Sequence, residues 1–123
     1  MKMVTAYVRY EAFEPIRASL LSKGFPSISI SEVKGSGRQK GITESYRGAK
    51  VTNYLRPKLK IEVGVRDEDC QLVIDTILEN ASSGEVGDGK IFVTNVEQSI
   101  RIRTGEFGEE TLQSHPAAAD AEA

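Results

Sequence analysis

The amino-acid sequence predicts an α+β domain in which a four-stranded antiparallel sheet carries two helices on one face. Three observations support this fold class. Apolar and polar residues alternate in four separate segments, as in half-buried strands. Two further segments carry apolar residues at helical spacing, one after the first strand and one after the third. A chain of 123 residues is long enough to bury the single core that this arrangement needs.

The first half of the pattern predicts a strand, a helix and a second strand. Residues 3–9 alternate between apolar and polar side chains and predict the first strand. The apolar spacing then becomes helical, which predicts a helix over residues 13–24 that ends at a glycine. Residues 27–33 alternate again and predict the second strand, with Ile28 and Ile30 directed toward the core.

The second half predicts a strand, a helix and a last strand. Residues 59–66 alternate most cleanly, so the third strand has one buried face and one exposed or interfacial face. Asp67 suits the N-cap of the next helix, whose apolar stripe runs from Cys70 to Ala81. Residues 90–96 predict the fourth strand. The resulting order, β-α-β-β-α-β, is the ferredoxin-like arrangement, which leaves one sheet face free for packing or assembly.

The same pattern sets the domain boundaries. Residues 1–112 form one predicted domain, and residues 113–123 lack apolar periodicity, which predicts a disordered tail. Between the second and third strands, a long loop of about residues 37–55 replaces a tight turn. Long loops inside compact domains are uncommon and usually functional, so this loop is a candidate for partner binding.

Composition excludes several classes of protein. The formal net charge of −2 and a pI of about 5.5 do not indicate a globally basic nucleic-acid surface. Cys70 is the only cysteine, which excludes an intramolecular disulfide and fits a reducing compartment. Apolar runs are too short to span a bilayer, and the N-terminus is too polar for a signal peptide. We therefore expect a soluble cytoplasmic protein without direct membrane insertion.

Three clusters of glycines and basic residues are compatible with phosphate binding. Glycines let successive N–H groups turn toward one anion, and basic side chains add charge. Taken alone, the cluster at residues 87–90 is better explained as a turn with an exposed lysine, and the pair at residues 101 and 103 as a charged strand edge. Three clusters on one small domain favour phosphate binding. They are Gly35, Gly37, Arg38, Gln39 and Lys40; Gly87, Asp88, Gly89 and Lys90; and Arg101 with Arg103, which would lie on one side of an extended segment.

Catalytic residue types are sparse. His115 is the only histidine and lies in the predicted tail, so a histidine-based triad cannot form. Cys70 falls on the apolar stripe of the second helix, which favours a core position over a nucleophile. Glu109 and Glu110 lie beside the predicted tail. We therefore expect no enzymatic activity.

Several motifs, in order and without a gap from about Glu32 to Gly108, resemble those of the nitrogen regulatory PII signal-transduction proteins. They are Glu32-Val33-Lys34-Gly35, Gly37-Arg38-Gln39-Lys40-Gly41, Tyr46-Arg47-Gly48-Ala49, Pro57-Lys58, Lys60-Ile61-Glu62, Gly87-Asp88-Gly89-Lys90-Ile91-Phe92-Val93 and Arg101-Ile102-Arg103-Thr104-Gly105-Glu106.

The resemblance implies a homotrimer with three nucleotide clefts between neighbouring subunits. ATP and ADP would compete there, and 2-oxoglutarate would join Mg²⁺ and ATP. At matching positions the nucleotide would be held by Ser29, Gly35, Gly37, Arg38, Gly64, Gly87, Asp88, Gly89, Lys90, Arg101 and Arg103. The 2-oxoglutarate residues would be Gln39, Lys40, Gly41, Lys58 and Gly87. Gln39 would also meet Mg²⁺, and Lys58 would pair with the γ-carboxylate.

The loop of residues 37–55 would be the partner-binding T-loop of the family. Its contact residues would be Tyr46, Arg47, Gly48, Ala49, Lys50, Val51 and Tyr54. Val51 stands at the family's uridylylated tyrosine position and Ala49 at the phosphorylated serine position of cyanobacterial members, so those covalent switches should be missing. Elsewhere, Ser29 replaces a common threonine and Gly64 a common valine.

Arg47 lies at the position that enters ammonium channels in the channel-binding members. The favoured partner is therefore an ammonium transporter, which would recruit the protein to the inner membrane face. Acetylglutamate kinase or another nitrogen-metabolism enzyme is second. The alternative is a diverged PII-like regulator that responds to adenylates or another small anion.

Two other classes remain as alternatives to a PII regulator. A ferredoxin-like nucleic-acid module would expose aromatic side chains on its sheet. The third strand offers Lys60, Glu62, Gly64 and Arg66 instead, so no nucleic-acid partner is expected. A nucleotide hydrolase would need a base positioned near the γ-phosphate, and the sequence does not identify one.

Overall fold

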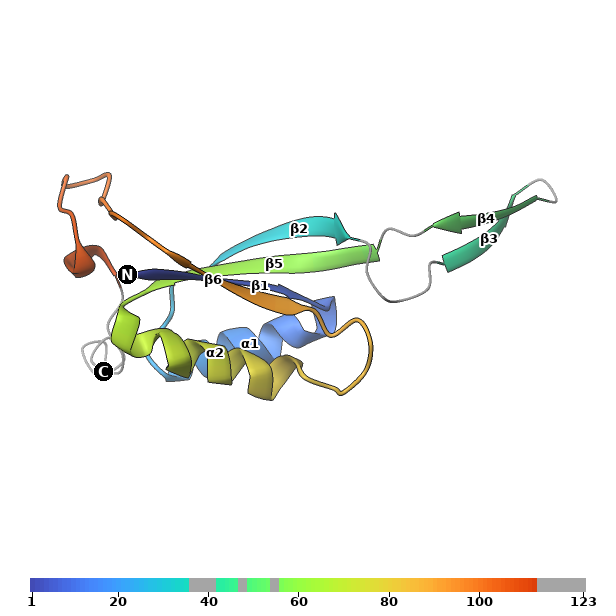
Figure 1. The fold of residues 1–123 in the computed structure, drawn as a ribbon, viewed down its shortest axis with the longest axis horizontal. Helices are drawn as coiled ribbons and strands as arrows, with labels where there is room; N and C mark the ends of the chain where they lie inside the picture. Colours follow the sequence, from blue (N-terminus) through green and yellow to red (C-terminus); the bar gives the residue numbers. More distant parts are fainter. Residues whose placement is uncertain (36–41, 47–48, 54–55, 113–123) are drawn as a thin grey trace.

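The computed structural model describes residues 1–35, 42–46, 49–53 and 56–112 (Figure 1). Its main sheet has the strand order β2-β5-β1-β6, and every neighbouring pair is antiparallel. The chain order confirms the predicted β-α-β-β-α-β fold. The elements are β1 (Lys2–Val8), α1 (Phe13–Ser22), β2 (Ser29–Gly35), β5 (Arg56–Val65), α2 (Asp67–Ala81) and β6 (Lys90–Asn95), with short 3-10 turns η1 (Tyr10–Ala12) and η2 (Glu109–Thr111).

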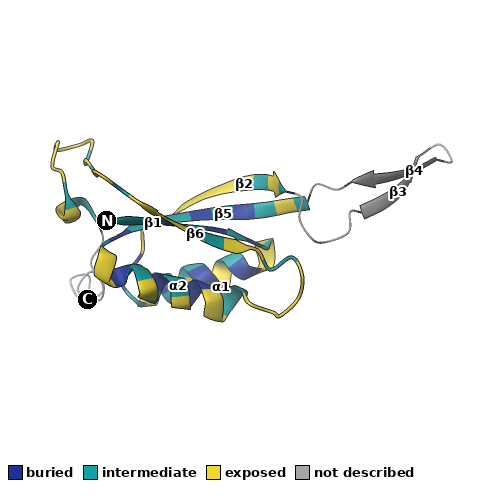
Figure 2. Ribbon diagram, viewed as in Figure 1, coloured by how far each residue is buried: buried dark blue, intermediate teal, exposed yellow. Residues whose placement is uncertain are grey.

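Both helices cover the same face of the sheet (Figure 1). The strand register explains which side chains they bury, because directly paired residues share a face. Val4 of β1 pairs with Val63 on one side and with Val93 on the other. Alternate residues of β1 and β5 therefore point toward the helices, and Figure 2 shows buried positions alternating along these strands. The core comprises Val4, Ala6, Val8, Ala12, Ile16, Leu20, Phe25, Leu59, Ile61, Val63, Val65, Val73 and Ile77.

Ile30 differs from the sequence expectation. It pairs with Ile61, so it lies on the helix-covered side of the sheet, as predicted. However, the side chain is 46% exposed, whereas Ile61 is fully buried. The reason is the strand order, because β2 is the edge strand and no further strand lies beyond it. The alternating pattern indicates the face of a residue, but not its depth in the sheet.

The start of α2 corrects a second expectation. Asp67 is the first residue of the helix, and Arg66 occupies the N-cap position. The carboxylate of Asp67 instead accepts a hydrogen bond from the α-amino group of Met1, with 2.9 Å between the nitrogen and Oδ1. This bond holds the pKa of Asp67 below its usual value. The charge still lies in the first helical turn, where it complements the helix dipole.

The loop predicted over residues 37–55 contains regular structure. Strands β3 (Ile42–Tyr46) and β4 (Ala49–Asn53) form a separate antiparallel ladder, drawn beyond the ends of β2 and β5 in Figure 1. The β-branched residues of these two segments favour strands, but glycines and charges hid that signal in the sequence. The rest of this loop and the predicted tail, residues 113–123, lie outside the described residues. Among the described helices, none combines the length and apolarity needed to cross a bilayer.

The helix packing predicts different costs for two neighbouring substitutions in α2. Ile77 is 1% exposed in the core, whereas Leu78 is 50% exposed. Ile77→Ala leaves a cavity and should lower the free energy of unfolding by about 2–5 kcal/mol. Leu78→Ala should lower it by about 1 kcal/mol or less. Urea unfolding followed by circular dichroism measures both, and equal losses would contradict this packing.

Candidate functional site

A cleft of about 520 Å³ lies where the loop between α2 and β6 meets the ends of β2 and β5. We call residues 82–89 the α2–β6 loop. Apolar groups such as Tyr7, Val33 and Phe92 contribute much of the cleft wall. Its charged lining residues are Lys34, Arg56, Lys58 and Lys90, together with the acidic Glu85 and Asp88. The cleft also contains residues of two predicted phosphate-binding clusters: Gly35 of the first, and Gly87, Asp88, Gly89 and Lys90 of the second.

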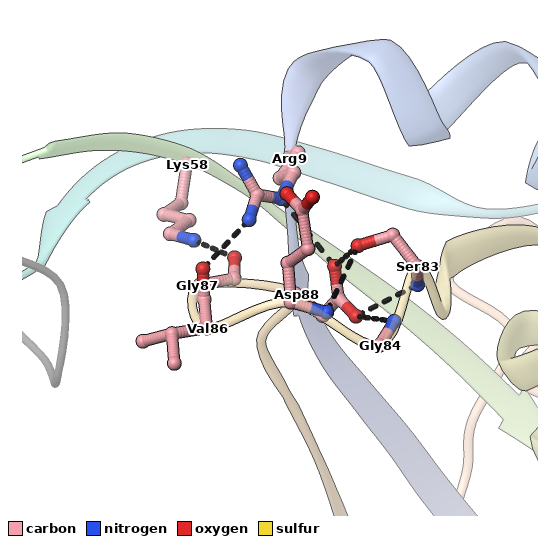
Figure 3. A network of polar contacts seen from close by, with 8 residues as sticks. Arg9, Lys58, Ser83, Gly84, Val86, Gly87 and Asp88 are labelled. Atoms are coloured by element: carbon pink, nitrogen blue, oxygen red, sulfur yellow. Dashed lines mark hydrogen bonds and ion pairs between the residues drawn. The ribbon is translucent and has the colours of Figure 1, made fainter.

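Asp88 stabilises the α2–β6 loop through hydrogen bonds to other residues of the same loop. Its carboxylate accepts hydrogen bonds from the backbone N–H of Ser83 (2.7 Å), the backbone N–H of Gly84 (3.0 Å) and the hydroxyl of Ser83. The Ser83 bonds are the main reason that the pKa of Asp88 is lowered to about 2. Figure 3 shows the carboxylate directed toward these two residues. Asp88, a predicted nucleotide residue, thus uses its charge to shape the loop.

Glycines allow the α2–β6 loop to pass close to β1. Gly87 and Gly89 have φ values of 101° and 108°, a region that other residues rarely adopt. A Cβ atom added to Gly89 would lie 1.7 Å from the carbonyl oxygen of Tyr7. Any side chain there would force the loop away from the sheet and widen the cleft.

Two cations, one in β5 and one just after β1, bind neighbouring carbonyl groups of this loop (Figure 3). Lys58 of β5 donates a hydrogen bond from Nζ to the carbonyl oxygen of Gly87. Arg9, which follows β1, donates from Nη2 to the carbonyl oxygen of Val86 at 2.8 Å. The Nε atom of Arg9 also lies 3.5 Å from Oδ1 of Asp88.

The electrostatics of the cleft favour an anion. Burial lowers the pKa of Lys58, and the nearby charge of Arg9 lowers it further, while Asp88 opposes the shift. Burial lowers the pKa because it removes water from the protonated amine, and Arg9 adds charge repulsion. A bound anion would interact favourably with both cations.

The sequence analysis did not include Arg9 among the site residues. The residue before it, Val8, pairs with Leu59, so Arg9 follows β1 at the same end of the sheet as Lys58 of β5. The only hint in the sequence was that a basic residue follows the first predicted strand. The sequence did not show that this strand pairs with β5, which is what brings Arg9 to the same end of the sheet as Lys58.

Two predicted nucleotide residues lie elsewhere, in a second pocket of about 230 Å³. Ser29 and Gly64 line it together with Glu62, which the sequence analysis did not select as a site residue. This pocket lies on the sheet face that the helices leave uncovered, because Met3 pairs with Gly64 and their neighbours in the strands are buried. Gly64 is six residues from Lys58 along β5, a separation of about 20 Å.

Arg101 and Arg103 lie in a turn, so the expectation of an extended segment was wrong. The turn is closed by a bridge between Ile100 and Phe107, and Gly105 supports the reversal with a φ of 76°. The guanidinium of Arg101 donates to Oε1 of Glu106 and to the carbonyl oxygen of Glu110, both at 3.2 Å. Arg103 is exposed.

The remaining predicted residues belong to the loop of residues 37–55. Tyr46, Ala49, Lys50 and Val51 belong to the β3–β4 ladder, where the structure describes the backbone pairing. Eight others lie outside the described residues: Gly37, Arg38, Gln39, Lys40, Gly41, Arg47, Gly48 and Tyr54.

Comparison with known proteins decides the family. The model of the family "Nitrogen regulatory protein P-II" matches residues 1–106. The chain belongs to the PII family. It is 46% identical over 112 residues to nitrogen regulatory protein P-II 2 of Methanothermobacter thermautotrophicus, which covers 91% of this chain and 97% of the relative. The nitrogen regulatory protein P-II of Rhizobium meliloti is 46% identical over 108 residues, or 88% of this chain and 96% of the relative. PII proteins are signal-transduction regulators rather than enzymes.

The network around Lys58 predicts pKa shifts of opposite sign in two variants. Asp88→Asn removes a negative charge that favours protonated Lys58, so the pKa of Lys58 should fall. Arg9→Gln removes a positive charge that disfavours it, so the same pKa should rise. NMR titration of the lysine side chains measures both shifts, with Lys23 on the helical side as an internal control. Shifts of the same sign would contradict the network.

Proposed function

We propose that this PII protein senses ATP, ADP and 2-oxoglutarate and controls nitrogen-assimilation targets through its T-loop. One observation carries the proposal: four basic residues, Lys58 and Lys90 among them, line the cleft beside a loop with three positive-φ glycines. A polyphosphate concentrates negative charge that such cations and backbone N–H groups bind through charge-assisted hydrogen bonds.

The contact of Lys58 supports a role for this residue in binding a carboxylate. Its present partner, the carbonyl of Gly87, is a neutral acceptor. A carboxylate is a stronger partner for an ammonium group, particularly where burial and Arg9 lower the lysine pKa. The γ-carboxylate of 2-oxoglutarate would replace the carbonyl. Gln39, outside the described residues, would provide an oxygen ligand for Mg²⁺, which would neutralise phosphate charge when bound.

The separation of the predicted nucleotide residues supports a homotrimer. Gly87, Gly89 and Lys90 lie at one end of the sheet, whereas Ser29 and Gly64 lie in the second pocket, at the other end. A neighbouring copy would place its second pocket against the cleft of the first copy, and one nucleotide would contact both. Each interface would thus hold one site, in a closed ring of identical contacts.

The T-loop would carry the signal to a partner. Strands β3 and β4 make a narrow two-stranded unit, a shape suited to entering a pore. An ammonium transporter is therefore the proposed target, and it would recruit the cytoplasmic protein to the inner membrane face. Acetylglutamate kinase or another nitrogen enzyme is the second candidate. Ligand binding near the base of the loop would favour one loop conformation over another.

Isothermal titration of 2-oxoglutarate tests the proposed function. Saturable binding is expected with Mg²⁺ and ATP and should be lost with ADP. Lys58→Ala should abolish it, because the carboxylate loses its charged partner. Lys23→Ala is the matched control, since Lys23 contacts Thr76 and Glu79 on the helical side, and it should bind normally.

Two other outcomes separate the alternatives. Nucleotide binding without 2-oxoglutarate binding would indicate the diverged PII-like regulator that responds to adenylates or another small anion. Absence of binding by both ligands would overturn the proposed cleft.

Mixing two variants tests whether each site is shared between copies. Lys90→Ala damages the cleft, and Arg101→Ala damages the segment beside the second pocket, so each variant alone should bind ADP weakly. Trimers refolded from an equal mixture should regain tight binding at about a quarter of the interfaces, where both intact halves meet. Calorimetric stoichiometry measures this fraction. A mixture no better than its components would contradict a shared site.

A further inference from the structure

Residues 99–112 form a compact C-terminal unit on the uncovered face of the sheet. The hydroxyl of Thr111 donates a hydrogen bond to the hydroxyl of Ser99. The backbone N–H of Gly108 donates to the carbonyl oxygen of Ser99 at 2.9 Å. Together with the Ile100–Phe107 bridge, these bonds fix the position of the next residue in the chain, Leu112.

Leu112 packs against Gly64, near the C-terminal end of β5. Its Cδ2 atom lies 3.5 Å from the position that a Cβ atom of Gly64 would occupy, which is an ordinary van der Waals distance. Met3 approaches the same position at 3.9 Å. The leucine therefore occupies space that the branches of a larger side chain at residue 64 would need.

This contact leaves the second pocket open. A volume of about 230 Å³ remains beside Ser29, Glu62 and Gly64 with Leu112 in place. Leu112 is partly buried and borders the pocket through Gly64 without filling it. A pocket lined by two serines, one carboxylate and the apolar residues Met3 and Ile28 suits a nucleotide base better than a phosphate, because the carboxylate would repel a phosphate.

We propose that Leu112 is a ligand-contacting residue that supplies the apolar wall for the nucleotide base, in place of the side chain that Gly64 lacks. This inference rests on the proposed function, since it concerns the nucleotide of that site. A base gains affinity by packing on an apolar side chain, and a glycine offers almost no such surface.

The contacts of Arg101 tie this wall to the phosphate end of the ligand. The guanidinium holds the carbonyl oxygen of Glu110, two residues before Leu112. The base wall and a predicted phosphate ligand thus belong to one short unit. The size of residue 64 and the position of Leu112 set the affinity for the base, while the charge of Arg101 acts on the phosphates.

Calorimetric titration of ADP into the full chain and three variants tests the proposal. Leu112→Ala should raise the dissociation constant roughly tenfold, as expected when an apolar contact with a ligand is removed. Adding Gly64→Val to Leu112→Ala should restore most of the affinity, because valine provides the missing wall in the space that the leucine left. Leu21→Ala, the same truncation at an exposed leucine of α1, is the matched control and should bind like the unmodified protein. Thermal unfolding of each variant confirms that it is folded.

Three results would overturn the inference. Unchanged or tighter ADP binding by Leu112→Ala would show that the leucine is neutral or blocks the pocket. Weaker binding that Gly64→Val does not restore would show that Leu112 acts only by stabilising residues 99–112. After either of these two results, the proposed function would still stand if the unmodified protein binds ADP. Failure of the unmodified protein to bind ADP would overturn both.

Discussion

The close approach of Gly89 to the carbonyl of Tyr7 is the constraint on which the candidate site depends. Only a residue without a Cβ atom can pass there, and the positive φ of Gly89 reverses the chain at the same point. Since this approach keeps the α2–β6 loop against β1, the carbonyl groups of Val86 and Gly87 come within reach of Arg9 and Lys58. Backbone geometry thus forms the frame of the proposed anion site, and the charged side chains are added to that frame.

The charged groups at the α2–β6 loop have two different roles: Asp88 stabilises the loop, whereas Lys58 and Arg9 are available to a ligand. Asp88 neutralises part of the cationic cluster, but its carboxylate is saturated by Ser83 and Gly84. Lys58 and Arg9 hold neutral carbonyl groups, which an anionic ligand can replace at little cost. Because these contacts already hold the α2–β6 loop, binding of the proposed ligand would lose less conformational freedom. In the proposed function, an effector bound there would gain contacts near the base of the T-loop, as a switch based on differential affinity requires.

The uncovered sheet face connects the separate parts of the proposed site. The cleft at Lys58 and the pocket at Gly64 lie on the same face of β5 but about 20 Å apart. The C-terminal unit of residues 99–112 reaches the second pocket through Leu112. A single chain therefore presents two incomplete surfaces, and assembly of identical copies would complete both at once. In the proposed trimer, this division would make ligand binding sensitive to assembly.

The amino-acid sequence by itself determined the order of the main-sheet strands and helices, and the family, but not the β3–β4 ladder. Alternation from Leu59 to Val65 and the apolar stripe through Val73 and Ile77 indicate a strand and a helix, because their periods differ. Glycines and basic residues also marked the α2–β6 loop. Only the tertiary structure decided the exposure of Ile30, the partner of Asp67 and the turn at Arg101. It also decided the contact of Arg9 with the carbonyl of Val86 and the contact of Leu112 with Gly64. Each of these depends on residues distant in sequence, and local periodicity contains no information about which strands become neighbours.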